Sequence, residues 1–222
     1  MVAPSTCIGC GVEGEVLCQL CLVSAGEPPV PRCVGCKRLT EDYATCRSCR
    51  NWINIHSVYV TTSYEGMYEQ LIRSFKFDVK RQAVDPIASI MVQASPPLAE
   101  PELILCPLPT APARIRQRGF DHAKLLARAY WRKLPEENRQ KLTIDHTLNR
   151  KSNTRQLGSD RAQRIAQVKD EFFVKNPLSV KGKTFLLLDD VTTTGASLAA
   201  AAKTLKNAGA KRIYAVVFAQ KS

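Results

Sequence analysis

Two neighbouring acids, Asp189 and Asp190, stand between a short hydrophobic run and a loop that is rich in hydroxyl groups. The run, residues 185–188, has no polar alternation, which is typical of a strand buried on both faces of a parallel sheet. The acids therefore come at the carboxyl end of a strand, where open α/β sheets bind their ligands. The loop covers residues 192–197, and an Ala- and Leu-rich helix is predicted to follow it to about residue 207.

A loop of this kind before a helix N-terminus can bind phosphate, because backbone N–H groups and the helix dipole both point at the anion. Gly195 supplies the conformational freedom or the close backbone approach that such a loop needs. The pattern is neither a Walker A loop nor a G-x-G-x-x-G fingerprint, because Gly-Lys-Thr at 182–184 precedes the strand. The alternative is a pair of solvated acids followed by threonines that only cap the helix.

The chain contains nine cysteines, and eight of them form four C-x-x-C pairs within the first 49 residues. Two thiolates of one tight turn and two of another can complete a tetrahedral shell around Zn²⁺. Two structural zinc ions are therefore expected, with redox dithiols or disulfides as the alternatives. The pairs could combine sequentially or as a cross-brace. The predicted ligands are Cys7, Cys10, Cys18, Cys21, Cys33, Cys36, Cys46 and Cys49.

Positive charge is concentrated in one block of the chain. The 222 residues carry a formal net charge of +12, and residues 114–164 contain 14 Lys and Arg against 5 Asp and Glu. Such a block attracts polyanions, namely nucleic acid or a polyphosphate ligand, and a solvated basic face is the alternative. If single-stranded DNA binds here, the expected contacts are Arg150, Lys151, Arg155 and Arg161.

The sequence contains no run of 18 apolar residues, and its first six residues do not resemble a secretion signal. We therefore expect no membrane insertion and a cytoplasmic location.

Strand and helix patterns alternate after the cysteine-rich segment. Strands are expected near residues 57–62, 103–106, 142–148, 172–174, 184–188 and 212–219, and helices over 66–77, 85–94, 121–134, 160–168 and 197–207. This order predicts an α/β fold with a parallel sheet and right-handed crossovers. The chain should divide into a zinc-binding domain of residues 1–52 and an α/β domain of residues 53–222.

A second loop should lie at the same edge of the sheet as the two acids, because it too follows a buried strand, residues 103–106. Cys106 is expected to be a core thiol at the end of that strand. The next stretch, 107–112, is proline-rich and is predicted not to be helical. It leads to Arg114, Arg116 and Arg118, whose guanidinium groups suit a pyrophosphate. Nucleic-acid binding or plain solvent exposure are the alternatives.

The run Asp189-Asp190-Val191-Thr192-Thr193-Thr194-Gly195-Ala196-Ser197 resembles the motif with which type I phosphoribosyltransferases bind phosphoribosyl pyrophosphate (PRPP). Together with the C-x-x-C pairs, the whole chain resembles the ComF family of competence-associated phosphoribosyltransferase-like proteins. The resemblance extends to Phe75-Lys76-Phe77, to Pro107-Leu108-Pro109, to residues 116–123 and to residues 154–161. The family often has Asn-Gln where this chain has Asp121-His122, which weakens any role transferred to these two residues.

The resemblance implies a type I phosphoribosyltransferase fold, a parallel sheet flanked by helices, preceded by a small segment with four-cysteine zinc sites, like a double zinc ribbon. It implies that PRPP binds with Mg²⁺. Asp189 and Asp190 would contact the ribose hydroxyls as the catalytic acids, and residues 191–197 would hold the 5′-phosphate. Lys76 and the three arginines would neutralise the pyrophosphate.

The implied reaction is transfer of phosphoribose to an unidentified nitrogen acceptor, in connection with DNA uptake. The alternative function is a non-catalytic single-stranded DNA-binding accessory protein for natural transformation. The family resemblance also suggests a competence helicase-type partner.

Overall fold

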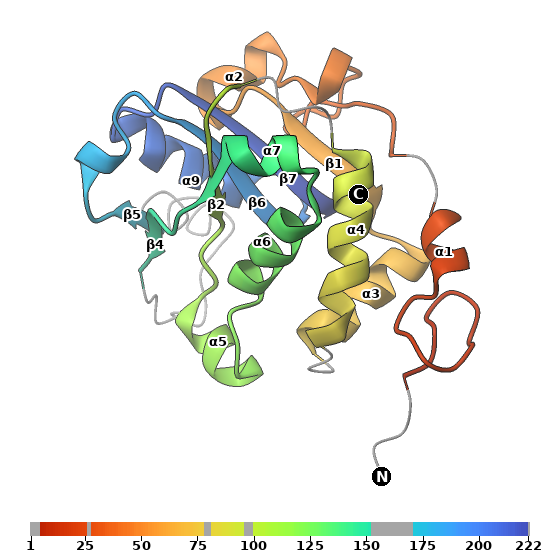
Figure 1. Cartoon of the computed structure of the whole chain (residues 1–222). Helices are drawn as coiled ribbons and strands as arrows, with labels where there is room; N and C mark the ends of the chain where they lie inside the picture. Colours follow the sequence, from red (N-terminus) through yellow and green to blue (C-terminus); the bar gives the residue numbers. More distant parts are fainter. Residues whose placement is uncertain (1–4, 26–27, 78–80, 96–99, 152–170, 222) are drawn as a thin grey trace, which may run out of the picture.

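The computed structural model describes residues 5–25, 28–77, 81–95, 100–151 and 171–221 (Figure 1). The predicted helix 160–168 and the proposed DNA contacts Arg155 and Arg161 lie outside these residues, as does the stretch 154–161 that contributes to the family resemblance.

Parallel strands form the central sheet, as the sequence predicts. Five strands of the described chain pair in the order β1-β7-β6-β2-β3. Their bounds are β1 Val58–Ser63, β2 Leu103–Pro107, β3 Leu142–Ile144, β6 Thr184–Thr192 and β7 Arg212–Gln220. All four strand pairings are parallel. The long central pair, β6 and β7, stays in register from Thr184 to Thr192, so it sets the position of the acid-containing segment.

Helices cover both faces of this sheet (Figure 1). One face packs against α3 (Gly66–Lys76), α4 (Val84–Ala94) and α6 (His122–Lys133), and the other against α9 (Ala196–Asn207). Because successive side chains of a strand point to opposite faces, Leu186 and Leu188 enter the first core, whereas Phe185 and Leu187 enter the second. This division decides which neighbours each acid of the pair meets.

Shorter elements surround these layers. They are α1 (Gln19–Val23), α2 (Arg47–Ile53), α5 (Pro112–Arg118), α7 (Glu136–Lys141), and the 3-10 turns Glu41–Tyr43, Arg81–Ala83 and Pro177–Ser179. A small antiparallel pair consists of β4 (Leu148–Arg150) and β5 (Phe172–Val174). The single strand expected over 142–148 is therefore wrong, because its first part joins the central sheet and the chain then turns away to pair with β5.

The expectation that Arg114, Arg116 and Arg118 lie on a loop after β2 is also wrong, because all three lie on α5. Pro112 lies in the first turn of α5, where its missing N–H removes no helical hydrogen bond. Gly119, in the left-handed conformation at φ 74°, ends the helix. The prolines before residue 112 remain outside the helix. The proline-rich stretch is therefore non-helical up to residue 111, and the helix begins at its last proline.

The cysteine-rich segment packs against both faces of the sheet. Its first half contributes Cys7, Val16 and Leu17 to the core that includes α3 and α4, and its second half contributes Cys33 and Val34 to the core that includes α9. The division into two domains at residues 52 and 53 stays a prediction. Cys106 is fully buried, as expected of a core thiol, and its burial raises its pKa to about 12.

Within the part of the chain that the structure describes, no helix combines the length and the apolar character needed to span a bilayer.

Candidate functional site

Strand β6 continues through the acid pair to Thr192, whereas the sequence suggested that the acids follow the strand. Pairing with β7 is maintained at Asp189, opposite Val217, and at Thr192, opposite Gln220. Alternation along a strand therefore turns Asp190 toward α3 and α6, and Asp189 toward the α9 face. The two carboxylates do not face the same side.

Asp190 lies in a buried cluster of charges. Its Oδ1 is 2.8 Å from the ammonium of Lys76 at the end of α3, and its Oδ2 is 3.3 Å from Nε2 of His122. The side chain of Asp190 is 4% exposed and that of Lys76 is 15% exposed. Burial alone would raise the pKa of Asp190, but the positive charge of Lys76 and the contact with His122 outweigh burial and lower it below its ordinary value. Asp190 is therefore ionised and paired.

His122, to which the sequence assigned no firm role, connects Arg118 to this cluster. Nη1 of Arg118 lies 2.8 Å from Nδ1 of His122, and a guanidinium can only donate. We therefore assign the ring proton to Nε2, on the side of Asp190. Burial lowers the pKa of His122 to about 4, although Asp190 opposes this effect, so the imidazole is neutral near pH 7. No spacing in the sequence signals this contact, because Arg118 and His122 belong to different helices.

Asp189 is the more accessible of the two acids. It is half-buried, and its Oδ1 accepts a hydrogen bond from the backbone N–H of Asp190 at 2.9 Å. Burial, reinforced by the charge of Asp190, raises the pKa of Asp189 to about 7. This carboxyl group therefore changes its charge near neutral pH.

The loop after β6 has the form expected of a phosphate-binding loop. Gly195 caps the N-terminus of α9 with φ 75°, a conformation that favours glycine. The side chains of Thr193, Thr194 and Ser197 are exposed, whereas Thr192 is buried. The first N–H groups of a helix have no intrahelical partner, so this loop offers backbone donors beside exposed hydroxyl groups.

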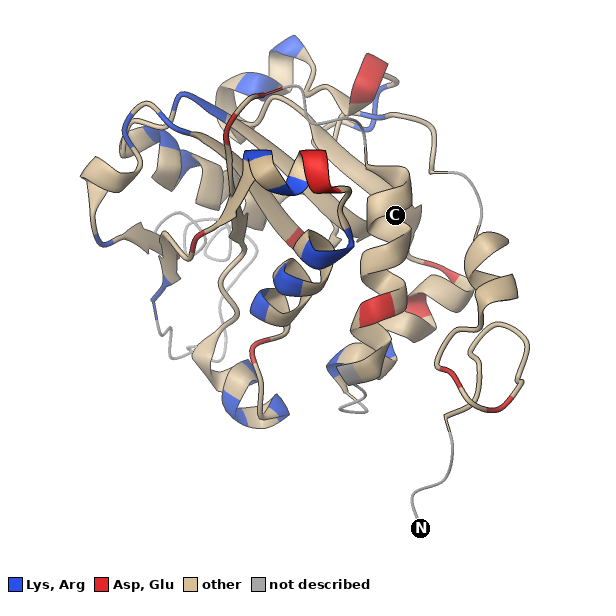
Figure 2. Cartoon of the chain, in the orientation of Figure 1, with Lys and Arg blue, Asp and Glu red and all other residues tan. Residues whose placement is uncertain are grey.

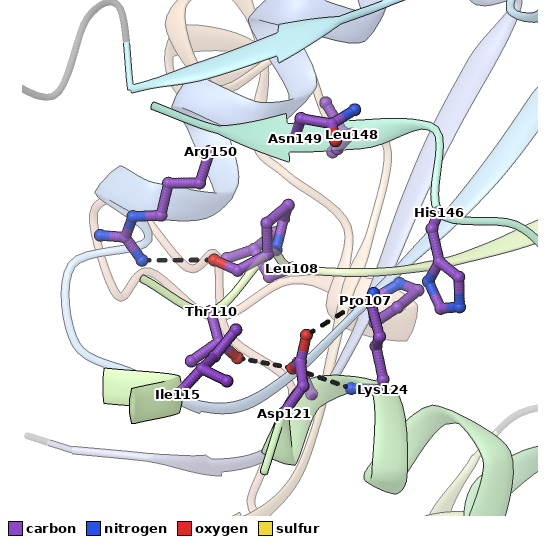
Figure 3. A pocket seen from close by; sticks show the side chains of 12 residues that line it. Pro107, Leu108, Thr110, Ile115, Asp121, Lys124, His146, Leu148, Asn149 and Arg150 are labelled. Carbon is purple, nitrogen blue, oxygen red and sulfur yellow. Dashed lines mark hydrogen bonds and ion pairs between the residues drawn. The ribbon is translucent and has the colours of Figure 1, made fainter. Parts of the chain in front are cut away.

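A cavity of about 170 Å³ adjoins the loop after β2 (Figure 3). Its lining residues are Pro107, Leu108, Pro109, Thr110, Ile115, Asp121, Ala123, Lys124, His146, Leu148, Asn149 and Arg150. The hydroxyl of Thr110 donates to Asp121 at 2.9 Å, which fixes the start of α6 against this loop. The N–H of Leu108 donates to the carbonyl of Leu188 at 2.9 Å, so the cavity wall is tied to β6 one residue before Asp189.

The arginines predicted for this edge do not act as one group. On a helix, position 116 points away from positions 114 and 118, which are four residues apart and share a face. Arg114 and Arg116 are exposed on α5, whereas Arg118 is 8% exposed and turned toward His122. Arg150 lines the cavity, donates to the carbonyl of Pro109 at 3.4 Å and forms an ion pair with Glu171.

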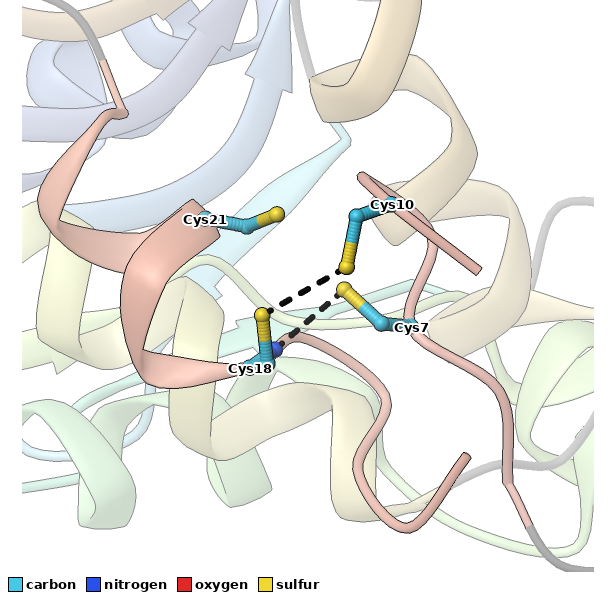
Figure 4. A group of neighbouring side chains, drawn as sticks. All are labelled: Cys7, Cys10, Cys18 and Cys21. Carbon is cyan, nitrogen blue, oxygen red and sulfur yellow. Dashed lines mark hydrogen bonds between the residues drawn. The ribbon is translucent and has the colours of Figure 1, made fainter. Parts of the chain in front are cut away.

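The eight N-terminal cysteines form two clusters by sequential pairing (Figure 4 shows the first). The four sulfur atoms of each cluster lie within 4.8 Å of one another. Sγ of Cys10 is 3.7 Å from that of Cys18, and Sγ of Cys36 is 3.6 Å from that of Cys46. Tetrahedral Zn–S bonds of about 2.3 Å place sulfurs about 3.8 Å apart. Both clusters therefore fit a zinc ion, and the cross-brace alternative does not apply.

Comparison with known proteins identifies the class of the domain that contains the acid pair. Residues 119–222 match the phosphoribosyl transferase domain family, and this part of the chain contains β6, the acid pair and the loop before α9. With the parallel sheet and its flanking helices, the match makes this a phosphoribosyltransferase-type α/β domain.

Two curated proteins are similar to this chain over most of its length. It is 27% identical over 206 residues to Competence protein ComFC of Bacillus subtilis (strain 168), covering 88% of this chain and 80% of that protein. It is 26% identical over 211 residues to Competence protein ComFC of Streptococcus pneumoniae (strain ATCC BAA-255 / R6), covering 90% and 86%. The chain is therefore similar to the ComFC competence proteins over most of its length.

Solved structures resemble the chain only distantly. The allosteric regulatory enzyme of purine biosynthesis matches with a TM-score of 0.38 and 14% identity, over 62% of this chain and 25% of that one. A hypoxanthine phosphoribosyltransferase from Staphylococcus aureus matches with a TM-score of 0.32 and 11% identity, over 63% and 62%. The fold assignment rests instead on the sheet and on the domain match.

Proposed function

We propose that this chain binds PRPP together with Mg²⁺ at the carboxyl end of β6 and transfers its phosphoribosyl group to a nitrogen acceptor, in a role linked to competence. The observation that carries the proposal is the position of residues 189–197. They join the central strand of a phosphoribosyl transferase domain to the N-terminus of α9. The names of the relatives support the link to competence.

In this proposal, different residues of the site bind different parts of PRPP. The loop of residues 191–197 holds the 5′-phosphate through backbone N–H and hydroxyl groups. Asp189, half-buried and the more accessible acid, accepts hydrogen bonds from the ribose hydroxyl groups. Asp190 acts from within the protein, where it fixes Lys76 and His122.

The reaction would form a bond between the acceptor nitrogen and C1 of the ribose and break the bond from C1 to the pyrophosphate oxygen. The leaving pyrophosphate takes the bonding electrons, and cationic groups stabilise its charge. Mg²⁺ bound with PRPP would supply part of that positive charge. The loop 107–110 and Arg150 border the cavity beside β6, which supports a place there for the pyrophosphate.

We also propose that each cysteine cluster holds one structural zinc ion, since both sulfur sets have the tetrahedral spacing. The boundary between a zinc-binding domain of residues 1–52 and a phosphoribosyltransferase-like domain of residues 53–222 belongs to this proposal. A cytoplasmic location and a helicase-type partner stay predictions.

Asp189→Asn should weaken the binding of PRPP with Mg²⁺ by about 10- to 100-fold, because a hydrogen bond to a charged acceptor is worth about 1.5–3 kcal/mol. Isothermal titration calorimetry measures this effect without requiring the acceptor. Since the pKa of Asp189 is about 7, the carboxylate ionises as pH rises from about 6 to about 8. The affinity of the wild type should rise over that range relative to the Asn variant.

Asp42→Asn provides the control, because it makes the same chemical change at an exposed acid of the cysteine-rich segment. Equal PRPP affinity in all three proteins would exclude Asp189 from the site. A folded, zinc-loaded wild type that does not bind PRPP would refute the proposed function.

A second candidate function, single-stranded DNA binding, is favoured by a basic stripe on α6. Lys124, Arg128 and Arg132 recur every four residues and are all exposed, so they share one face of the helix. Figure 2 shows Lys and Arg along this helix and on α5, which precedes it. Arg150, in contrast, is held by Glu171 and Pro109. The stripe, more than Arg150, supports contacts to a phosphate backbone.

Replacing Arg128 and Arg132 together by Ala should lower the affinity for single-stranded DNA and flatten its salt dependence. Each lost phosphate contact on a single strand reduces the slope of log K against log salt by about 0.7. Fluorescence anisotropy over a salt series measures both quantities. The control removes two exposed cations elsewhere, Lys203 and Lys211. Equal slopes for both double variants would show that α6 does not contact the DNA.

A further inference from the structure

The second cysteine cluster, formed by Cys33, Cys36, Cys46 and Cys49, lies directly against the loop of residues 191–197, called here the phosphate-type loop. Val34, between two of its ligands, is 1% exposed, and a Cβ added to Gly195 would come within 3.0 Å of its Cγ2 atom. One residue beyond the cluster's second cysteine, the ammonium of Lys37 donates to the carbonyl of Thr193 at 3.1 Å. Two separate contacts therefore join this segment to the loop, one apolar and one polar.

The backbone of Lys37 is held in place by the turn that carries the cysteines. Its N–H donates to the carbonyl of Cys33 at 2.8 Å, and its own carbonyl accepts from Nη1 of Arg32 at 3.0 Å. Lys37 has φ 63°, a left-handed conformation that is uncommon outside glycine and needs support from its surroundings. The cluster thus fixes where the Lys37 side chain begins.

A lysine ammonium has three N–H donors, and the carbonyl of Thr193 takes one of them. The carbonyl belongs to the loop itself, two residues before Gly195, which caps the N-terminus of α9. An anion bound by the N–H groups of this loop would therefore meet the positive charge of Lys37. The half-buried position of the side chain reduces the screening of that charge by water.

We propose that Lys37, positioned by the second cysteine cluster, is a ligand of a phosphate monoester bound in the loop of residues 191–197. The inference rests on the proposed function, because it assigns a further residue to the same site. It makes the cysteine-rich segment part of the binding site rather than an appendage to it. A purely structural role for Lys37 would instead confine its effect to stability.

The test is calorimetric titration of the full, zinc-loaded chain with ribose 5-phosphate and, separately, with PRPP and Mg²⁺. Lys37→Ala should weaken the binding of both ligands at least about 10-fold, because a charge-assisted contact is lost. Lys37→Arg, which keeps the charge, should retain most of the affinity. Arg38→Ala is the matched control, since it removes a neighbouring exposed cation and should change affinity less than about 2-fold. Each variant should still contain two zinc ions.

The outcomes separate this inference from the proposed function. Normal affinity of a zinc-loaded Lys37→Ala variant for both ligands would overturn the inference and leave the proposed function standing. Lys37-dependent binding of ribose 5-phosphate without binding of PRPP would support the inference and refute the proposed function. A wild type that binds neither ligand would overturn both. An equal loss of affinity in Arg38→Ala would also overturn the inference, because the effect would then come from the net charge of the segment and not from a contact of Lys37 with the ligand.

Discussion

Asp190→Asn is expected to lower the free energy of unfolding by about 3–5 kcal/mol, the cost of leaving one member of a buried ion pair without its partner. The variant leaves the ammonium of Lys76 in a site where it is 15% exposed, without the carboxylate that lies 2.8 Å away. Lys76→Met should cost a similar amount, because it leaves the buried carboxylate of Asp190 without the ammonium that pairs with it. Chemical denaturation of the zinc-loaded protein measures both.

The double variant, Lys76→Met with Asp190→Asn, should be destabilised by much less than the sum of the single changes, because neither charge remains buried alone. An exposed pair on the same helix gives the control. Arg73 and Glu69 are 3.5 Å apart with side chains 67% and 38% exposed, so Arg73→Ala should cost only about 0.2–0.5 kcal/mol. Small and additive changes in the free energy of unfolding for the variants at positions 76 and 190 would contradict a buried ion pair.

This result affects how the site should be tested. A loss of PRPP binding in an Asp190 variant would combine damage to the site with loss of stability. Asp189, which is half-buried and whose contact is with the backbone N–H of its neighbour, gives the cleaner variant for binding studies.

Cys33→Ser should lower the zinc content from two ions to one per chain and lower the melting temperature by about 10 °C or more. Structural zinc sites contribute about 10–16 kcal/mol of apparent binding free energy. For a chain of this size, each kcal/mol shifts the melting temperature by about 2–4 °C. Cys33 is fully buried in the core that includes α9, so loss of its metal should also loosen the phosphate-type loop. Metal analysis and thermal denaturation measure the two effects.

Two variants calibrate this experiment. Cys106→Ala changes a fully buried cysteine outside the clusters and should leave both zinc ions in place. Cys10→Ser removes an exposed ligand of the first cluster and should cost one zinc with a smaller change in melting temperature. A Cys33→Ser variant that keeps two zinc ions and its melting temperature would rule out metal at the second cluster.

Local features of the sequence were enough to predict the cysteine clusters, the buried strand that leads to the acid pair and the loop that precedes α9. Each depends on residues close together in the chain: the C-x-x-C spacing, the apolar run 185–188 and the hydroxyl groups of residues 192–197. Their geometry is set by the backbone of a single turn, strand or helix end, so the type and spacing of residues determine it. The errors occurred at boundaries. The start of α5 at Pro112 depends on where the prolines stop, and the end of β6 depends on pairing with β7.

Contacts between distant segments were decided only by the tertiary structure. Lys76 and Asp190 are 114 positions apart, and Lys37 and Thr193 are 156 positions apart. Neither contact leaves a periodic trace in the sequence, because each partner only follows the pattern of its own element. The sequence by itself therefore determined which chemical groups this protein has at its loop and clusters. The packing of α3, α6 and the second cysteine cluster against β6 decided which of those groups meet, because only the folded chain turns Asp190 inward and leaves Asp189 the more accessible acid.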